Sequence, residues 1–303
     1  MSILLKELKK ADHLYNDEYA SVYNDAWWDK DMWKPAGEFH IHTLASLLKT
    51  SKNWLDVGCG TGYFLNKFPQ VDRSGLDLSS DMLDKARISN PGVEFLHQSM
   101  TDKNQSLEGK FDLVSCTGQP WLYLPDMEAI ERSIIRMAEW TSPNGKVMLA
   151  PFDLFDILGL DLPADFYDIS TNITRDPVPT TLGTIWTYKE LDGNYYPLLS
   201  PNLDQWVRWF SVFFRKIEIL FRTDVPRGTL QALRRIIVCS EKRVPGDDTP
   251  ASIVYPNEPL HLVKEPDPVQ NTINALSSKQ LVSELFSRLK SGRLLKSALR
   301  RFK

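Results

Sequence analysis

The sequence is poor in cysteine and has no long apolar run. Its 303 residues include three cysteines, Cys59, Cys116 and Cys239, an odd number at wide spacing. This count argues against a disulfide framework, and no pair has the spacing of metal ligands, so we predict no metal site. No apolar stretch approaches the roughly 18 residues of a membrane-spanning helix. The first residues, MSILLKELKKADH, also lack the apolar core of a signal peptide, and we therefore expect a cytoplasmic protein.

The chain as a whole lacks a strong net charge, which is formally −3, but its distribution is uneven. The stretch 277–303 has eight Lys or Arg and one Glu, a balance of +7, so the body before it is acidic and carries −10. The apolar residues of this stretch fall on two helical faces separated at Ser291 and Gly292, which predicts two short basic amphipathic helices. Such helices bind either an anionic membrane surface, here the inner face, or a partner protein or the chain's own domain. The body shows no basic aromatic face, and we expect no nucleic-acid partner.

Strand-like and helix-like segments alternate between residues 53 and 152. We expect strands at 53–57, 74–79, 93–99, 110–117 and 145–152, helices at 2–30, 39–50, 62–68, 80–88 and 126–141, and then a helix at 202–214 and strands at 216–220 and 233–241. This alternation predicts an α/β fold, a doubly wound and mostly parallel seven-stranded sheet with an insertion after strand 5.

The predicted domain, residues 1–243, begins with a helical cap over residues 1–50. The insertion, at about 153–200, is rich in Asp, Pro, Thr and aromatic residues and contains a hairpin that turns at Asp192–Gly193. We expect it to form a lid over the strand ends. A Pro-rich linker, 244–276, then follows as an extended rather than a packed segment and leads to the basic tail, 277–303.

The stretch WLDVGCGTGYF places three glycines, Gly58, Gly60 and Gly62, directly after a buried strand. Glycine weakens the interior of an element, so this cluster predicts a tight turn or the close approach of a ligand to the backbone. The turn differs from the dinucleotide pattern G-x-G-x-x-G, because position 63 is Tyr. A nicotinamide-dependent oxidoreductase would require glycine at that position. Asp56 would repel a pyrophosphate but suits a ligand that carries an ammonium group.

These residues resemble the class I S-adenosylmethionine-dependent methyltransferases. The family's first motif, acid-x-G-x-G-x-G, is similar to the stretch from Asp56 to Gly62, and its second motif is similar to GLDLSSDMLDKAR, in which Asp77 is the acid. The resemblance covers residues 50–150 well and 205–243 loosely. It implies a Rossmann-like fold, S-adenosyl-L-methionine as the cofactor, and a ribose held by Asp77, with Leu78 and Met82 of the same motif beside it.

The remaining cofactor contacts follow from the same resemblance. After the third strand the family usually has Gly-Asp, whose carboxylate binds the adenine amino group, whereas this chain has Gln98 and Ser99. We expect Ser99 to hydrogen-bond the adenine and Met100 to line its pocket. Thr117 and Gly118 end the fourth strand, where the family places the methionine end of the cofactor.

The acceptor is predicted to be a sugar, a glycan or another small metabolite that is methylated on oxygen. An oxygen acceptor must lose its proton, so a general base is needed, and the candidates are His97 and His40. Asp153 or Glu190 of the insertion are alternatives. Aromatic residues suited to stacking on an acceptor are expected around the mouth, namely Trp121, Tyr123, Trp186, Tyr188, Tyr195 and Tyr196.

Other interpretations stay open. The stretch TGQPWLY is similar to the Asn-Pro-Pro-aromatic motif of amino-group methyltransferases, which makes an N-methyltransferase of a small molecule the alternative. A non-catalytic methyltransferase-like binding scaffold is a further one. In the cap, Tyr15, Tyr19 and Tyr23 lie at i, i+4 and i+8 and share one helical face, which either packs on the body or faces a ligand.

Overall fold

The computed structural model describes residues 14–29, 33–152, 178–190, 194–222 and 235–256. All of them belong to one compact unit, residues 1–256. The predictions for the tail at 277–303, for Asp153 and for the hairpin turn at 192–193 lie outside the described residues.

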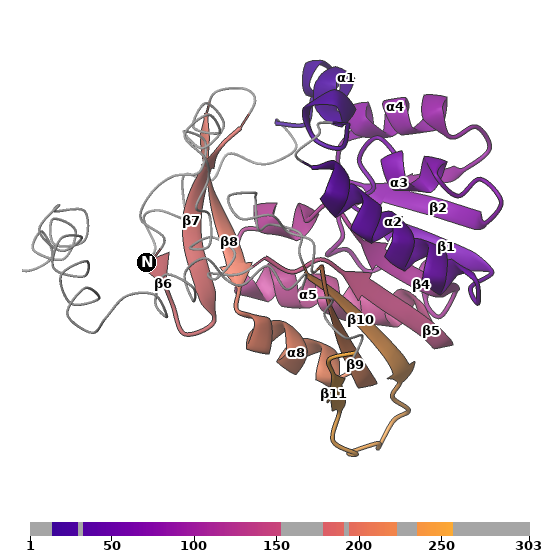
Figure 1. The fold of residues 1–303 in the computed structure, drawn as a ribbon, viewed down its shortest axis with the longest axis vertical. Helices are drawn as coiled ribbons and strands as arrows, with labels where there is room; N and C mark the ends of the chain where they lie inside the picture. The colour runs from indigo at the N-terminus through magenta and orange to yellow at the C-terminus, as the bar shows by residue number, and fades with distance from the viewer. Residues whose placement is uncertain (1–13, 30–32, 153–177, 191–193, 223–234, 257–303) are drawn as a thin grey trace, which may run out of the picture. The chain divides into compact units, whose positions relative to one another are not determined.

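The elements follow the expected order (Figure 1). The helices are α1 (Asp17–Ala26), α2 (Lys34–Leu48), α3 (Tyr63–Asn66), α4 (Ser80–Ser89), α5 (Met127–Trp140) and α8 (Leu203–Ser211), with 3-10 turns η2 (Gln105–Leu107) and η3 (Pro120–Tyr123). The strands are β1 (Asn53–Val57), β2 (Asp72–Asp77), β3 (Glu94–His97), β4 (Phe111–Cys116), β5 (Thr141–Leu149), β6 (Val178–Pro179), β7 (Gly183–Lys189), β8 (Tyr195–Pro201), β9 (Phe214–Phe221), β10 (Arg235–Lys242) and β11 (Ser252–Val254).

The main sheet has the order β11-β9-β10-β5-β4-β1-β2-β3. Strands β1 to β5 are parallel, and β10 runs antiparallel to both β5 and β9. From β1 the chain proceeds outward through β2 and β3, and then returns to the other side of β1 with β4 and β5. The strand order therefore reverses between β1 and β4, which is where a doubly wound sheet binds its ligands. The predicted α/β fold class is confirmed.

The sheet has eight strands rather than the expected seven, because β11 lies in the segment that we expected to be an extended linker. Its residues pair parallel to β9, with Ser252 opposite Lys216 and Val254 opposite Glu218. The segment between Pro250 and Pro256 contains no proline, so its backbone N–H groups are available to the sheet. For these three residues the expectation of an unpacked segment is wrong.

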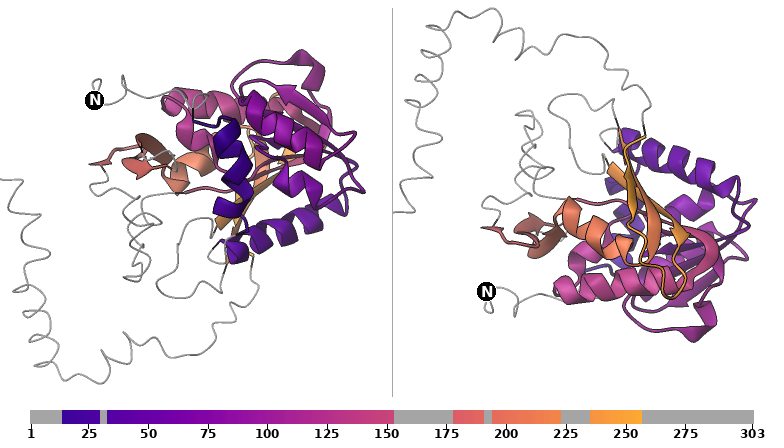
Figure 2. Two further views of the ribbon diagram at one scale, coloured as in Figure 1. Left: turned by 90° about the horizontal axis from the view of Figure 1, so that it is seen from above. Right: turned by 90° about the horizontal axis from the view of Figure 1, so that it is seen from below.

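Helices cover both faces of the sheet, with α2 on one face and α5 and α8 on the other (Figures 1 and 2). Because both faces are covered, the central strands are buried along their length. In β1, four consecutive residues are buried, including Leu55 and Val57. Helix α5 is amphipathic and buries Ile130, Ile134 and Met137, while Asp126 caps its first turn.

Strand β5 begins at Thr141, four residues before the expected start. Between the pairs Phe111–Thr141 and Leu113–Lys146, β4 advances by two residues and β5 by five, so that the SPNG stretch forms a bulge. Gly145 is required there, because a Cβ at this position would lie 2.7 Å from the Phe111 carbonyl oxygen. The turn expected before the fifth strand is thus contained within it.

The described part of the insertion is a small three-stranded sheet, β6-β7-β8. Strands β7 and β8 are antiparallel and pair from Gly183–Pro201 to Lys189–Tyr195, as the hairpin prediction requires. Glu190 directly follows β7 and is buried at the turn end of the hairpin, where its N–H donates to the Asn194 carbonyl.

Candidate functional site

The glycine turn joins β1 to α3 and brings bare backbone to the carboxyl ends of the strands. Gly58, Gly60 and Gly62 all have positive φ, at 66°, 53° and 72°, a conformation that other residues rarely adopt. A Cβ on Gly58 would lie 2.2 Å from Cγ of Pro120, and one on Gly62 would lie 2.5 Å from Nδ2 of Asn90. The glycines are therefore needed both for the turn and for the close packing of η3 and α4 against it.

Asp77 ends β2 and faces this turn. Its Oδ2 accepts a hydrogen bond from the Gly60 N–H at 2.8 Å, and its Oδ1 accepts one from the Ser79 N–H at 2.9 Å. Burial raises the pKa of Asp77 above its usual range, and these backbone hydrogen bonds act in the opposite direction. A carboxylate offers about four acceptor positions, so each oxygen keeps a lone pair for a ligand hydroxyl.

Asp56 lies beneath the turn and is 1% exposed. Its Oδ1 accepts hydrogen bonds from Ser115 Oγ at 2.6 Å and from Thr117 Oγ1 at 3.4 Å. Burial raises its pKa to about 7, although the two hydroxyls lower it. Its Oδ2 is buried without a hydrogen-bond partner among the described residues. Asp56 thus supports the strand ends from below.

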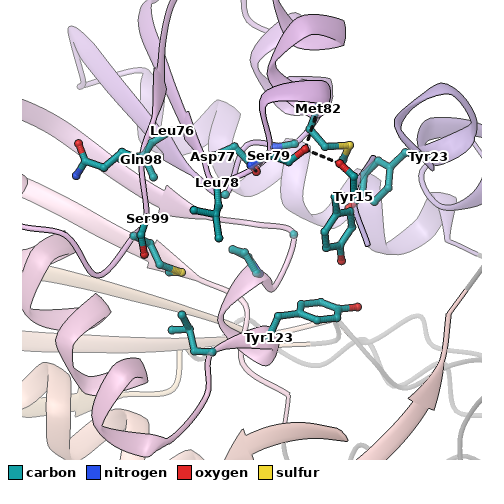
Figure 3. Close-up of a pocket in the computed structure, with 16 residues that line it drawn as sticks. Tyr15, Tyr23, Leu76, Asp77, Leu78, Ser79, Met82, Gln98, Ser99 and Tyr123 are labelled. Carbon is teal, nitrogen blue, oxygen red and sulfur yellow. Dashed lines mark hydrogen bonds between the residues drawn. The ribbon is translucent and has the colours of Figure 1, made fainter. Parts of the chain in front are cut away.

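A pocket opens at the reversal of strand order, between the glycine turn, the end of β2, η3 and the cap (Figure 3). It is lined by Tyr15, Tyr23, Gly58, Gly60, Leu76, Asp77, Leu78, Ser79, Met82, Gln98, Ser99, Met100, Gly118, Pro120, Tyr123 and Leu124. The predicted site residues Gly58, Gly60, Asp77, Leu78, Met82, Ser99, Met100 and Gly118 are among them. The predicted residues Asp56, Gly62 and Thr117 are not part of this lining and lie behind it.

Gln98 and Ser99 form one side of the pocket, at the end of β3. The Gln98 side chain is held by its neighbours, since it donates to the Asp102 carbonyl at 3.3 Å and accepts from Asn104 Nδ2 at 2.8 Å. The Ser99 hydroxyl lies 2.9 Å from the Thr101 hydroxyl. The side chains that line the pocket on this side are neutral, and the nearby Asp102 carboxylate accepts from the Ser99 N–H at 3.3 Å without being part of the lining.

Tyrosines form the other side of the pocket. Figure 3 shows Tyr15, Tyr23 and Tyr123 on one side of Asp77, and Gln98 and Ser99 on the other. The rings of Tyr15 and Tyr123 are 5.5 Å apart, and those of Tyr15 and Tyr23 are 6.3 Å apart. The tyrosine stripe of the cap therefore both packs on the body and faces the pocket.

The structure does not place either predicted histidine in the described lining of the pocket. His40 is buried on α2 against Trp28 and Phe64, and burial lowers its pKa to about 4. His97 is exposed at the end of β3, and its Nε2 lies 2.8 Å from the Leu78 carbonyl oxygen. Their roles as bases stay predictions.

Sequence reasoning did not place Tyr15, Tyr23, Pro120 and Leu124 in the pocket. For the tyrosines, the i, i+4, i+8 spacing was a usable signal, because it put them on one face. Of the aromatic residues expected at the mouth, Tyr123 lines the pocket, whereas Trp121 is buried against Trp206, at 4.7 Å between ring centroids. Trp186 and Tyr196 are also buried, and the side chains of residues 188 and 195 lie outside the description.

Comparison with known proteins shows what the part of the chain that forms the glycine turn and the central strands is similar to. Residues 55–145 match the family model described as "Methyltransferase domain". A dTDP-3-amino-3,6-dideoxy-alpha-D-glucopyranose N,N-dimethyltransferase of Streptomyces fradiae is 31% identical over 148 residues, which cover 46% of this chain and 54% of that protein. A dTDP-3-amino-3,4,6-trideoxy-alpha-D-glucopyranose N,N-dimethyltransferase of Streptomyces venezuelae is 30% identical over 142 residues, covering 46% and 59%. The chain thus spans little more than half the length of these relatives.

The fold has a counterpart among solved structures. The crystal structure of the PH0226 protein from Pyrococcus horikoshii OT3 is similar with a TM-score of 0.51 and 18% sequence identity, over 74% of this chain and 98% of that one. This likeness concerns the fold alone. The match of residues 55–145 to the methyltransferase-domain family, the glycine turn and the acid at the end of β2 are what this part of the chain has in common with class I methyltransferase domains. The cofactor of this class of domain is S-adenosyl-L-methionine. Among the described helices, none combines the length and the apolar character that crossing a bilayer requires.

Proposed function

We propose that the pocket binds S-adenosyl-L-methionine and that the protein transfers its methyl group to the amine of a small, sugar-like molecule. The observation that carries this proposal is the position of Asp77. Its two oxygens are fixed by the Gly60 and Ser79 N–H groups at the mouth of the glycine turn. A carboxylate held in this way can accept both hydroxyls of a ribose.

The residues present fit the cofactor in order along the pocket. The neutral groups of Gln98 and Ser99, with Met100, suit a flat adenine on one side of Asp77. The bare backbone of Gly58 and Gly118 suits the amino-acid end, because no side chain obstructs it. The sulfur would then face the tyrosines on the other side of Asp77, where an acceptor must enter.

The comparisons favour nitrogen over oxygen as the methylated atom. Both relatives are named as N,N-dimethyltransferases of amino sugars attached to dTDP, which supports the alternative that the TGQPWLY stretch suggested. These names make O-methylation, which was the main expectation from the sequence, the less supported interpretation. Because the chain spans about half the length of these relatives, their substrates enter here as a proposed class, an amino sugar, and not as an assignment.

Methyl transfer needs few catalytic groups from the protein. The bound cofactor would supply a methyl group on a positively charged sulfur, and the acceptor nitrogen would attack the methyl carbon in line and displace the sulfur. The protein's part is to hold the two reactants in line and to exclude water, which together supply much of the rate enhancement of such a displacement. The half-buried wall formed by Tyr123 and the cap tyrosines Tyr15 and Tyr23 is suited to both tasks.

The proposal is tested with two measurements on the purified protein. Calorimetry with S-adenosylhomocysteine should show binding at one site. An assay with S-adenosylmethionine should then show methylation of dTDP-3-amino-3,6-dideoxy-alpha-D-glucopyranose, while the analogue with a hydroxyl in place of the amine should not react. Methylation of the hydroxyl analogue alone would overturn the assignment to nitrogen. The lack of any binding heat would overturn the whole proposal.

A further inference from the structure

A buried carboxylate lies behind the tyrosine side of the pocket. Glu190, at the end of β7, is 2% exposed. Its Oε2 accepts a hydrogen bond from the Tyr19 hydroxyl at 2.8 Å, and its Oε1 accepts one from the Tyr123 hydroxyl. The two donors come from α1 and η3, which are 171 and 67 residues away in the chain. Burying a carboxylate is costly, so such a site needs partners of this kind.

Tyr123 connects this carboxylate to the pocket. Its side chain lines the pocket, across from Asp77 in Figure 3, while its hydroxyl donates to Glu190. Burial raises the pKa of Tyr123 well above its usual range, and the charge of Glu190 raises it further. A side-chain hydrogen bond with Tyr15 lowers the pKa of Tyr123 but does not outweigh these effects, so Tyr123 keeps its proton and donates it to the carboxylate. One lone pair of its oxygen is then left to accept a hydrogen bond from a ligand.

Tyrosines of the cap are among the described ionisable groups around Glu190. Tyr15, Tyr19 and Tyr23 all have a raised pKa, first because of burial, and the charge of Glu190 contributes in each case. Asp77 and, more weakly, Asp56 act on Tyr23 in the same direction. The hydroxyls thus remain neutral, and the acceptor that two of them, Tyr19 and Tyr123, contact is the Glu190 carboxylate.

We infer that Glu190 and Tyr123 form a proton relay that removes a proton from the acceptor's ammonium group before methyl transfer. This inference rests on the proposed N-methyltransferase function. An alkylammonium group such as that of lysine has a pKa near 10.4, so at neutral pH its nitrogen carries a proton in place of the lone pair that must attack.

The step balances in protons and charge. The ammonium N–H donates its proton to the Tyr123 oxygen, while the Tyr123 hydroxyl passes its own proton to Glu190 Oε1. With the cofactor bound, the freed nitrogen lone pair would form the new N–C bond as the C–S bond breaks, which would move the positive charge from sulfur to nitrogen. Tyr123 touches the substrate in this scheme and is the catalytic residue. Glu190 acts through it, and Tyr19 positions Glu190 through the second hydrogen bond.

The relay is tested by kinetics across pH. We compare wild type, Glu190→Gln, Tyr123→Phe and the double variant, with saturating S-adenosylmethionine and the dTDP-3-amino sugar. Each single variant should lose about 100-fold in kcat at pH 6.5, the lower range for a proton-transfer group. The kcat of the double variant should be no lower than that of the less active single variant, since both changes break the same relay. The binding of S-adenosylhomocysteine should stay within about threefold.

The pH profile separates the relay from a structural role. A variant without the relay uses only acceptor molecules that arrive as free amine. Its loss of kcat relative to wild type should therefore shrink about tenfold for each unit by which the pH rises, until the pH reaches the pKa of the amine. Glu190→Asp should recover part of the activity. The control Glu131→Gln, on the exposed face of α5, should match wild type. A deficit that is constant with pH, or no deficit, would overturn the relay while the function stands. A wild type that binds S-adenosylhomocysteine but methylates no amine would overturn the acceptor assignment, and the relay with it.

Discussion

The two sides of the pocket are built from different kinds of sequence. On the cofactor side, the glycine turn and Asp77 come from one strand-turn-helix-strand unit of the chain, and short backbone hydrogen bonds fix them to one another. On the tyrosine side, Tyr19, Tyr123 and Glu190 come from the cap, from η3 and from the insertion. The first side depends on backbone conformation, and the second depends on how three separate elements pack.

This difference indicates how the two sides tolerate change. A Cβ added to Gly58 would lie 2.2 Å from the rigid Pro120 ring, and one added to Gly62 would lie 2.5 Å from Nδ2 of Asn90, so neither position has space for it. The tyrosine side is held by side chains, so its geometry can vary with the insertion while the sheet stays intact. We expect changes on the cofactor side to abolish binding, and changes on the tyrosine side to alter turnover.

The largest effect should follow from Asp77→Asn. An amide nitrogen at the Oδ2 position would face the Gly60 N–H, donor against donor, and a ribose would lose charged hydrogen bonds of about 1.5–3 kcal/mol each. Calorimetry should show S-adenosylhomocysteine binding weakened by about 1,000-fold. The control Asp84→Asn, an exposed residue of α4 paired with Arg87, should bind like wild type. Equal affinity in the two variants would contradict the role of Asp77.

The next effect concerns the turn itself. Gly58→Ala places a Cβ 2.2 Å from Pro120 Cγ at a φ of +66°, so we expect a loss of about 3 kcal/mol in the free energy of unfolding, from overpacking and left-handed strain. Gly92→Ala is the matched control, because its φ is +80° but nothing lies within 4 Å of the added Cβ. It should lose only about 1 kcal/mol. Urea unfolding of both variants measures the difference, and equal losses would show that the proline contact is not what requires glycine.

The same division between the cofactor side and the tyrosine side separates the features that the sequence predicted from those that it did not. Strand β1, the turn and Asp77 were predicted because the pattern and its geometry are local. The hydrogen bonds to Glu190 could not be, because no periodicity links residues 67 and 171 positions apart. Strand β11 was missed for a related reason. A three-residue edge strand is defined by its partner β9, and the prolines around it favour a linker when the sequence is considered alone.

A smaller effect should appear in the pH dependence of stability. Burial raises the pKa of Asp56 from its usual 3.8 to about 7, so the folded state holds a proton there that the unfolded chain has already lost. The folded state is therefore destabilised as pH rises from about 4 to 7. Relative to Asp56→Asn, wild type should lose about 2 kcal/mol between pH 5 and pH 7, as measured by urea unfolding. A difference that does not change with pH would mean that Asp56 is ionised throughout.

The smallest effect is expected at His97. Its ring lies at the surface and contacts the Leu78 carbonyl, outside the described lining of the pocket. If Tyr123 and Glu190 move the proton, His97→Asn should change kcat by less than about threefold in the amino-sugar assay. A loss of about 100-fold would instead support the histidine as the base.

The most direct test of the central claim is a crystal structure of the protein with S-adenosylhomocysteine. We expect the ribose hydroxyls on the Asp77 carboxylate, the adenine beside Ser99, and the sulfur directed toward Tyr123. A nucleoside bound elsewhere, or turned so that the sulfur faces Gln98 and Ser99, would contradict the account.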